Sequence, residues 1–393
     1  MSEMSYLEKL LDGVEVEWLP LGEVSALRRG RVMSKGYLTE NFGPYPVYSS
    51  QTANNGKIGS INTFDFDGEY ISWTTDGANA GTVFYRTGKF SITNVCGLIT
   101  LKSKYPLIYK FLFYWLTIEA KKHVYSGMGN PKLMSHQVEN IPVPIPCPDN
   151  PEKSLAIQSE IVRVLDKFTA LTAELTAELN MRKKQYNYYR DQLLSFKEDE
   201  VEWKTLGEVA QYSKTRISFE LLDERNYVGV DNLLQNRAGK SLSNHVPTSG
   251  KLTEFIPNDI LIGNIRPYLK KIWQADCIGG TNGDVLVIRC IDSSINTRYL
   301  YQILADDKFF EYNMQHAKGA KMPRGSKEDI MKYPIPVPPL TWQARIVEIL
   351  DKFDTLTNSI TEGLPREIEL RQKQYEYYRD LLFSFPKPET VSN

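Results

Sequence analysis

The chain has few of the features that mark secreted, metal-binding or membrane proteins. Its 393 residues include only four cysteines, which lie far apart, so neither a disulfide framework nor a zinc site is expected and a reducing compartment is favoured. Its four histidines are equally scattered and suggest no shared metal ion. A signal peptide and an apolar run of membrane-spanning length are both missing. We therefore expect a soluble, cytoplasmic protein.

Sequence signatures of catalysis are also missing. No glycine-rich fingerprint opens a helix after a strand, and no GxxxxGK phosphate loop occurs. The Asn-Pro-Pro-aromatic stretch that amino-methyltransferases carry is absent, and the carboxylates form no nuclease-like cluster. These absences predict a chain that binds rather than catalyses, with no catalytic residue, no metal ion and no cofactor of its own.

An excess of charge is lacking as well. The formal net charge is −1, from 47 basic and 48 acidic residues. A balanced total does not exclude nucleic acid as a partner, because basic residues can gather on one face of a protein. With 41% apolar residues, a chain of this length has enough material for two or three domains with real cores.

What the sequence does contain is a long heptad pattern. From Ala156 to Phe196, apolar residues recur at alternating steps of four and three, and no Gly or Pro interrupts them. A seam of this length predicts a long helix that lies against another helix. A buried helix of an ordinary α/β domain is the alternative, but such helices usually run for only about 8–20 residues.

The partner for this helix is a second copy of it. Val162–Phe168 is matched by Val347–Phe353, and Arg182–Asp191 by Arg371–Asp380. Two copies in one chain predict an intramolecular antiparallel coiled coil. The residues expected to pack in it are Leu165, Phe168, Leu175, Leu179, Tyr189, Leu350, Phe353, Ile360, Tyr378 and Leu382.

The two copies differ in length. Phe168 and Gln185 are 17 positions apart, whereas Phe353 and Gln374 are 21 positions apart. The extra residues put a stutter into the second seam, and Pro365 would break a helical hydrogen bond there. The sequence leaves open whether the second helix is continuous, and we expect the extra turn to loop out at Gly363.

The repeat extends beyond the helices. Val16–Val24 recurs as Val201–Val209, so the repeat unit is about half of the chain. Ser5–Gly13 resembles the end of the long helix, as a partial third copy would. We therefore expect a cyclic arrangement, with the start of the chain beside the end of the last helix.

Each half contains a mixed α/β pattern followed by a proline-rich segment. Alternating prolines in Ile141–Pro148 and Tyr333–Pro339 exclude helix and predict stiff hinges. The expected strands are Glu69–Thr74, Thr82–Tyr85, Val95–Leu101, Asp259–Asn264 and Asp284–Arg289, and the expected helices are Leu107–Lys122 and Thr297–Leu304. The predicted organisation is a first α/β domain with an N-terminal helical fragment (1–153), a first long helix (154–197), a second α/β domain (198–340) and a second long helix (341–388).

Loops in both halves carry residue types that bind DNA. Arg and Lys neutralise phosphates, and Arg to guanine and Asn or Gln to adenine are the usual paired base contacts. A solvated surface charge is the alternative for each residue alone, but clustering at matched positions of both halves favours the set. The candidates are Arg28, Arg29, Lys35, Gln51, Asn54, Lys57, Asn79, Lys132, Lys214, Arg216, Asn264, Arg266, Tyr268, Lys270, Lys271, Lys321 and Arg324.

This order of globular unit, proline segment and long helix, given twice, resembles the specificity subunit of type I restriction-modification systems. The resemblance covers nearly the whole chain. It is carried by the two proline segments, by Gln158 and Gln343 in the repeated helix starts, by the repeated helix ends, and by Gly127–Lys132 and Gly263–Tyr268 within the globular units.

The resemblance implies that each globular unit is a target recognition domain that reads one half of a split, asymmetric DNA sequence, with the helices as a ruler. It also implies a prokaryotic protein on which two methyltransferase subunits dock, using S-adenosylmethionine for DNA methylation of adenine; restriction subunits can join them. A coiled-coil adaptor with two protein- or glycan-binding modules is the alternative. A standalone methyltransferase or nuclease is disfavoured by the missing motifs.

Overall fold

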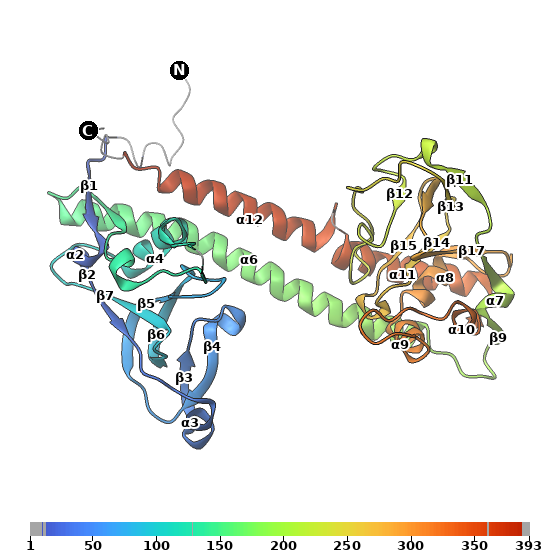
Figure 1. Cartoon of the computed structure of the whole chain (residues 1–393), viewed down its shortest axis with the longest axis horizontal. Coiled ribbons are helices and arrows are strands. Elements are labelled where there is room, and N and C mark those ends of the chain that lie inside the picture. Colours follow the sequence, from blue (N-terminus) through green and yellow to red (C-terminus); the bar gives the residue numbers. More distant parts are fainter. Residues whose placement is uncertain (1–9, 11–12, 128, 360, 387–393) are drawn as a thin grey trace. The chain divides into compact units, whose positions relative to one another are not determined.

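The computed structural model describes residue 10 and residues 13–127, 129–359 and 361–386. The chain forms two compact units: unit 1 consists of Met1–Leu171 and Gln372–Asn393, and unit 2 of Thr172–Arg371. Figure 1 shows their elements. Nearly all of the expected N-terminal helical fragment lies outside the described residues.

A six-stranded sheet with one helix against it forms the centre of unit 1. The helix, α4 (Tyr109–Glu119), buries Phe111 and Leu112 against Ile71, Trp73 and Ile99 of the sheet. Among the described strands of this sheet, β3 and β6 are the one parallel pair. In spatial order the strands are β2 (Ser25–Arg29), β7 (Cys96–Leu101), β5 (Phe66–Thr74), β6 (Val83–Ile92), β3 (Phe42–Tyr48) and β4 (Lys57–Ile61). The expected strands and helix of this half are confirmed, while β2, β3 and β4 were not foreseen.

The proline-rich segments, which were expected to be stiff hinges, are extended strands that pair with other strands. In unit 1, β8 (Pro142–Pro146) pairs antiparallel with β1 (Val16–Pro20). In unit 2, β18 (Pro334–Val337) pairs in the same way with β9 (Glu202–Thr205). Because the prolines occupy alternate positions, the missing N–H donors all fall on one side of the strand, and a two-stranded sheet tolerates them there.

Short elements complete unit 1. They are α2 (Leu21–Val24), α3 (Lys35–Glu40), η1 (Ala53–Gly56), η2 (Ala120–His123) and α5 (Ser135–Val138). The indole of Trp18 in β1 donates to the carbonyl of Pro386 at 2.8 Å. The start of the described chain therefore lies beside the segment after the last helix, as the cyclic arrangement predicts.

Unit 2 contains two four-stranded sheets. The first has the order β10 (Ala210–Tyr212), β17 (Val285–Cys290), β14 (Ile260–Gly263) and β15 (Ile272–Gln274). The second has the order β11 (Arg216–Ser218), β13 (Lys251–Phe255), β16 (Gly279–Thr281) and β12 (Tyr227–Val228). The helices are α7 (Leu206–Val209), η3 (Phe219–Leu221), η4 (Pro267–Leu269), α8 (Thr297–Leu304), α9 (Asp307–Gln315) and α10 (Lys327–Ile330).

A common frame links the two globular parts. The order β2-β7-β5-β6 of unit 1 is repeated as β10-β17-β14-β15 in unit 2. The register also agrees, since Ile71 faces Ile99 in one frame and Ile260 faces Ile288 in the other. The parts outside this frame differ: β3, β4 and α3 extend the sheet of unit 1, whereas unit 2 adds a separate second sheet.

The first long helix is continuous. α6 spans Pro151–Leu193, so it begins and ends slightly earlier than the expected segment 154–197; proline is well tolerated in the first turn of a helix. In unit 1 its first part packs antiparallel against the end of the second helix, where Phe168 stacks on Tyr378 with ring centroids 5.3 Å apart. Leu165 and Leu382 are fully buried in the same core.

The last part of α6 lies in unit 2, where it packs against the start of the second helix. Tyr189 stacks on Phe353 with ring centroids 5.5 Å apart, although Tyr189 remains 44% exposed. Leu350 is fully buried. Leu175 and Leu179, between the two packed ends, are only half-buried.

The second long helix is broken, as the loop expected at Gly363 predicts, so the segment 341–388 is not one continuous helix. α11 (Leu340–Asn358) and α12 (Gly363–Leu382) are separate helices. Gly363 has a φ of +79°, a left-handed conformation that glycine adopts without strain. Pro365 then falls in the first turn of α12, where its missing N–H breaks no hydrogen bond. Ile360, expected in the seam, lies outside the described residues.

Candidate nucleic-acid interface

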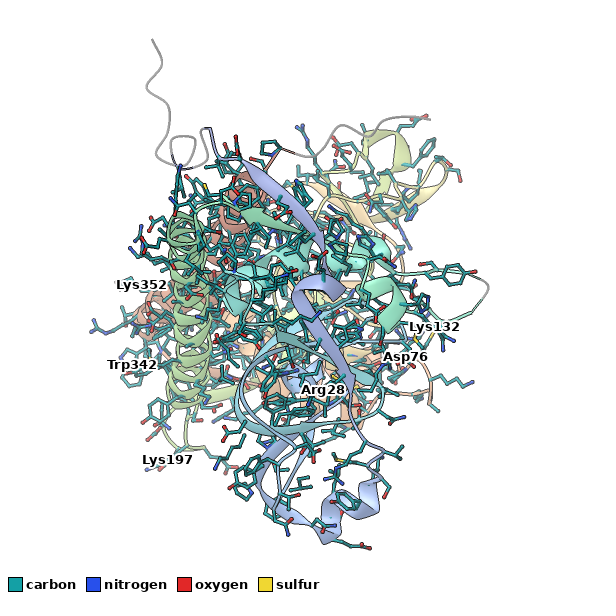
Figure 2. All side chains as sticks on the ribbon, turned by 90° about the vertical axis from the view of Figure 1, so that its left-hand side faces the viewer. Arg28, Asp76, Lys132, Lys197, Trp342 and Lys352 are labelled. Carbon is teal, nitrogen blue, oxygen red and sulfur yellow. The ribbon has the colours of Figure 1, made fainter. Side chains whose placement is uncertain are left out.

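In unit 1, the end of β2 meets two loops that carry predicted site residues. Arg29 donates to the carbonyl of Asn94 at 3.2 Å and to the sulfur of Met134 at 3.6 Å. Lys132, two residues before Met134, forms backbone bridges with Tyr125 and with Asp76. Figure 2 labels Arg28, Asp76 and Lys132 in this region. Arg29 thus contacts the turn that contains Lys132, while Arg28 and Asn79 are exposed on β2 and on the β5–β6 turn.

A second loop of unit 1 presents amide side chains. Asn54 and Asn55 both have a φ of +54° and Gly56 has a φ of +80°, so the backbone makes a left-handed turn. Gln51 donates to the carbonyl of Lys57 at 2.8 Å and closes the loop. Gln51, Asn54 and Lys57 are exposed. Asparagine is suited to such a turn, because it tolerates left-handed backbone better than other residues with side chains.

Arg86 supports the loop that carries Asn54. It was not among the residues predicted from the sequence. Arg86 lies in β6 and is only 2% exposed. It donates to the Ser72 hydroxyl at 2.9 Å and to the Asn55 carbonyl at 2.8 Å, and its guanidinium lies 3.7 Å from the centre of the Tyr48 ring. Burial lowers the pKa of Arg86. A basic residue within an apolar strand pattern was the available signal.

Arg31 supports the short helix that begins at Lys35. Its guanidinium donates to the Tyr37 hydroxyl at 3.0 Å and forms an ion pair with Asp65 at 3.1 Å. The hydrogen bonds to Tyr37 and Asp65 raise the pKa of Arg31, although partial burial opposes them. Lys35 itself is exposed at the start of α3.

In unit 2, exposed predicted residues gather around the loop after β14. Arg266 has a φ of +52°, and its N–H donates to the carbonyl of Pro323 at 2.7 Å. Tyr268 is 50% exposed. The neighbouring turn carries Lys321, which is exposed, and Arg324, whose guanidinium forms an ion pair with Asp284. A guanidinium, a phenol and two further cations therefore border one loop.

Other predicted residues of this loop point inward. Asn264 is 5% exposed and Lys271 is 9% exposed, and the Lys271 ammonium donates to the carbonyl of Val230. Burial lowers the pKa of Lys271. Lys270 forms an ion pair with Asp307 at 2.6 Å. In this conformation Asn264 and Lys271 are parts of the loop's support rather than surface groups.

The remaining predicted residues lie where the chain passes from β10 of the first sheet into β11 of the second. Lys214 and Arg216 are exposed, and Arg216 donates to the Thr253 hydroxyl at 3.1 Å. β11, which contains Arg216, pairs with β13, whereas Arg266 follows β14 of the first sheet. The structure therefore divides the predicted set of unit 2 between two sheets.

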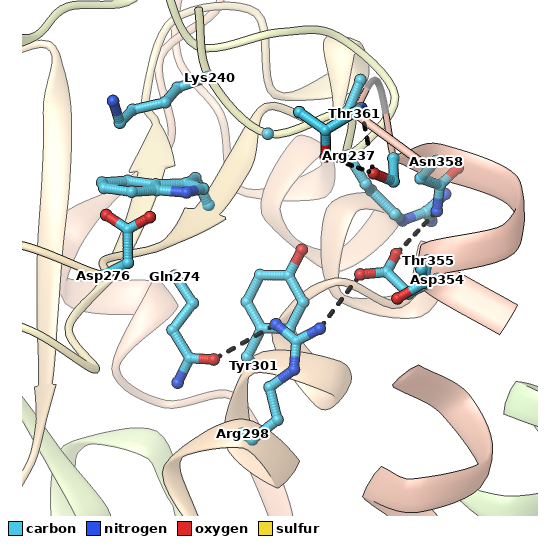
Figure 3. A pocket seen from close by; sticks show the side chains of 14 residues that line it. Arg237, Lys240, Gln274, Asp276, Arg298, Tyr301, Asp354, Thr355, Asn358 and Thr361 are labelled. Atoms are coloured by element: carbon cyan, nitrogen blue, oxygen red, sulfur yellow. Dashed lines mark hydrogen bonds and ion pairs between the residues drawn. The ribbon is translucent and has the colours of Figure 1, made fainter. Parts of the chain in front are cut away.

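A cavity of about 390 Å³ in unit 2 is a different candidate for a binding site (Figure 3). Arg298, which lines it, is already paired: it donates to Asp351 at 2.8 Å, to Asp354 at 3.2 Å and to Gln274 at 3.3 Å. These contacts join α8 to α11. The cavity is best explained as a polar packing seam.

Metal and membrane sites find no support in the described part of the chain. Within it, His, Cys, Asp and Glu nowhere gather in a group able to hold a metal ion. None of the helices described has the length and apolar character needed to cross a membrane. The four cysteines are all free.

Comparison with known proteins places both halves in one family. The family model described as "Type I restriction modification DNA specificity domain" matches residues 13–182 and 198–370. The Type I restriction enzyme EcoR124I/EcoR124II specificity subunit of Escherichia coli is 43% identical over the full length of both chains. The EcoprrI specificity subunit, also of Escherichia coli, is 36% identical over 92% of this chain and 93% of its own.

A solved structure has the same fold at low sequence identity. The crystal structure of the type I restriction-modification system S subunit from M. genitalium superposes with a TM-score of 0.64 at 16% identity. The match covers 98% of this chain and 100% of that one.

Proposed function

Since the chain belongs to the family of type I restriction-modification DNA specificity subunits, we propose that its two units each read one half of a split, asymmetric DNA sequence. The family model matches the chain twice, once in each half. The chain is thus a DNA-recognition subunit. It is not itself an enzyme, and catalysis belongs to its partner subunits.

The observation that best supports separate reading is one frame with two different sets of exposed groups. Beside the frame β2-β7-β5-β6, unit 1 presents the amide-rich loop of Gln51 and Asn54 between β3 and β4, while the loop after β14 in the equivalent frame of unit 2 presents Arg266 and Tyr268. Amides suit adenine and arginine suits guanine, so the two units present different base preferences.

The partners are methyltransferase subunits, of which the resemblance implies two, and restriction subunits that can join them. We propose that S-adenosylmethionine binds to the methyltransferase subunits and that this chain holds no cofactor. We also propose the cytoplasm of a prokaryote as its location, where it would meet the host DNA. The alternative adaptor with protein- or glycan-binding modules is not supported, because a DNA specificity domain matches both halves.

Salt dependence of DNA binding tests the proposal directly. The chain, in complex with its methyltransferase subunits, should bind a duplex library with an affinity that falls steeply between about 50 and 200 mM salt, because phosphate contacts release counterions. Sequencing of methylated sites in a host that expresses the complex should give two fixed half-sites with a spacer. An affinity for DNA that does not change with salt concentration, or methylation without a bipartite site, would contradict the proposal.

A further inference from the structure

The loops that border Arg266 and Lys132 are built in the same way in both units. In each unit a loop leaves the central strand of the frame, β5 or β14, and is tied to the turn before α5 or α10. Equivalent backbone hydrogen bonds make the tie: Gly77 to Pro131 at 3.0 Å and Leu133 to Thr75 at 2.8 Å in unit 1, Arg266 to Pro323 at 2.7 Å and Gly325 to Asn264 at 3.2 Å in unit 2. These matching hydrogen bonds therefore show which positions of unit 1 are structurally equivalent to which positions of unit 2, without any sequence alignment.

Two of these equivalent positions are basic in both units. Lys132 and Arg324 each form two backbone bridges, one within their own turn and one with the loop after the central strand. Arg29 and Lys214 form the second pair. Leu27 pairs with Ile99 in unit 1, and Tyr212 pairs with the equivalent Ile288 in unit 2. Arg29 lies two positions after Leu27, and Lys214 lies two positions after Tyr212. Arg29 and Lys214 are exposed, and the Arg324 side chain remains 53% exposed beside Asp284.

Neighbouring positions of the same frame differ in chemistry. Gly77 of unit 1 stands where unit 2 has Arg266, because both N–H groups donate to the proline of the tied turn. Counting from there, Asn79 takes the place of Tyr268. Arg28, one residue before Arg29, takes the place of Ser213. The varied positions therefore lie directly beside the constant basic ones.

Phosphates are the same at every DNA site, whereas base edges change with the sequence. Two units that read different half-sites on one frame have reason to keep the cations that contact phosphate and to vary the groups that contact bases. Resting on the function proposed above, we propose that Lys132 and Arg29 of unit 1, and Arg324 and Lys214 of unit 2, are phosphate contacts common to both half-sites. The positions of Gly77 and Arg266 then set base preference.

Selection from a random duplex library, followed by salt titration on the selected site, tests this division. The complete complex with its methyltransferase subunits is used for Lys132→Ala, Arg324→Ala, Arg324→Lys and Arg266→Gly. Lys352→Ala is the matched control, because Lys352 lies on α11, is 75% exposed and pairs only with Glu348 among its described neighbours. Circular dichroism confirms that each variant is folded.

Lys132→Ala and Arg324→Ala should select the unchanged sequence with lower affinity, and each should reduce the slope of log affinity against log salt by about one. Arg324→Lys should keep that slope, and Arg266→Gly should change the bases selected in one half-site only. A base preference altered by Lys132→Ala or Arg324→Ala, or an unchanged salt slope in both, would overturn the division. Loss of salt-dependent binding in the unmodified complex would instead overturn the function itself.

Discussion

At the scale of single residues, exposed arginines next to the tied loops are the strongest candidates for base contacts. Replacing Arg266 by Ala should weaken or relax recognition of one half-site by about 1–3 kcal/mol for each lost base contact. Arg28→Ala should act on the other half-site. Methylated-site sequencing of each variant measures this, and a variant that loses preference equally in both halves would argue against separate reading.

Asp292 provides a pH-dependent contact in unit 2. Hydrogen bonds from the Lys204 ammonium at 2.8 Å, and from the N–H and hydroxyl of Ser294, lower the pKa of Asp292 to about 2. An unfolded aspartate has a pKa of about 3.9. The carboxylate therefore stabilises the fold above about pH 4, and this contribution is lost as the pH falls toward 2.

Asp292→Asn should accordingly lower the melting temperature at pH 7, and the difference from the unmodified chain should shrink below about pH 4. Thermal unfolding between pH 2 and 7 measures it. Asp199→Asn, at an exposed aspartate, is the matched control and should show no such trend. A difference that stays constant down to pH 2 would assign the effect to packing rather than to the charge of Asp292.

Residue type and loop position predicted which regions present cations, but they did not predict which way each side chain faces. Arg266 and Asn264 belong to one motif, yet Arg266 is exposed and Asn264 is buried. The difference depends on the turn at Pro323, which lies far away in sequence and whose carbonyl accepts a hydrogen bond from the N–H of Arg266. Arg86 was missed for the same reason, since its partner Asn55 is brought to it by the fold of a distant loop.

At the scale of elements, the heptad seam predicts which leucines hold the helices together. Leu165 in unit 1 and Leu350 in unit 2 are fully buried, so each replacement by Ala should destabilise its unit by about 2–5 kcal/mol. Leu370→Ala, at a position that is 40% exposed on α12, is the control and should change stability by no more than about 0.5 kcal/mol. Unchanged thermal unfolding of Leu165→Ala and Leu350→Ala would refute the packed seam.

Elements with a strong local pattern were predictable from the sequence. α8 was expected at Thr297–Leu304 and is found there, with the Asn296 side chain capping its first turn. The strands β11, β12 and β16 were not foreseen, because each has only two or three residues and gains its stability from pairing with distant strands. Proline periodicity excluded helix correctly but could not reveal that β1 and β9 supply pairing partners.

At the scale of the whole chain, the two halves resemble each other more closely in backbone structure than in sequence. The two frames share strand order, register and loop ties, although little sequence matches between the landmarks. Apolar patterning is enough to preserve a sheet and its covering helix, so exposed positions are free to vary. This is why the sequence predicted the repeat and the family readily, while the equivalence of Gly77 and Arg266 required the structure.

The long helices give the last prediction, which concerns the DNA spacer. α6 is continuous and contributes residues to both units, whereas the second helix is interrupted between Asn358 and Gly363. Four residues in a continuous helix correspond to about 6 Å, or nearly two base pairs of B-DNA at about 3.4 Å each. Residues added in a break between helices need not change helix length at all.

Deleting residues 359–362 should therefore leave the spacer between the methylated half-sites unchanged. Deleting residues 176–179 from α6 is the matched comparison, because Thr176–Leu179 repeats the sequence of Thr172–Leu175 and its removal leaves the junction with the same neighbours. That deletion should shorten the spacer by one or two base pairs. If the first deletion shortens the spacer and the second does not, the interrupted helix rather than α6 determines the spacing.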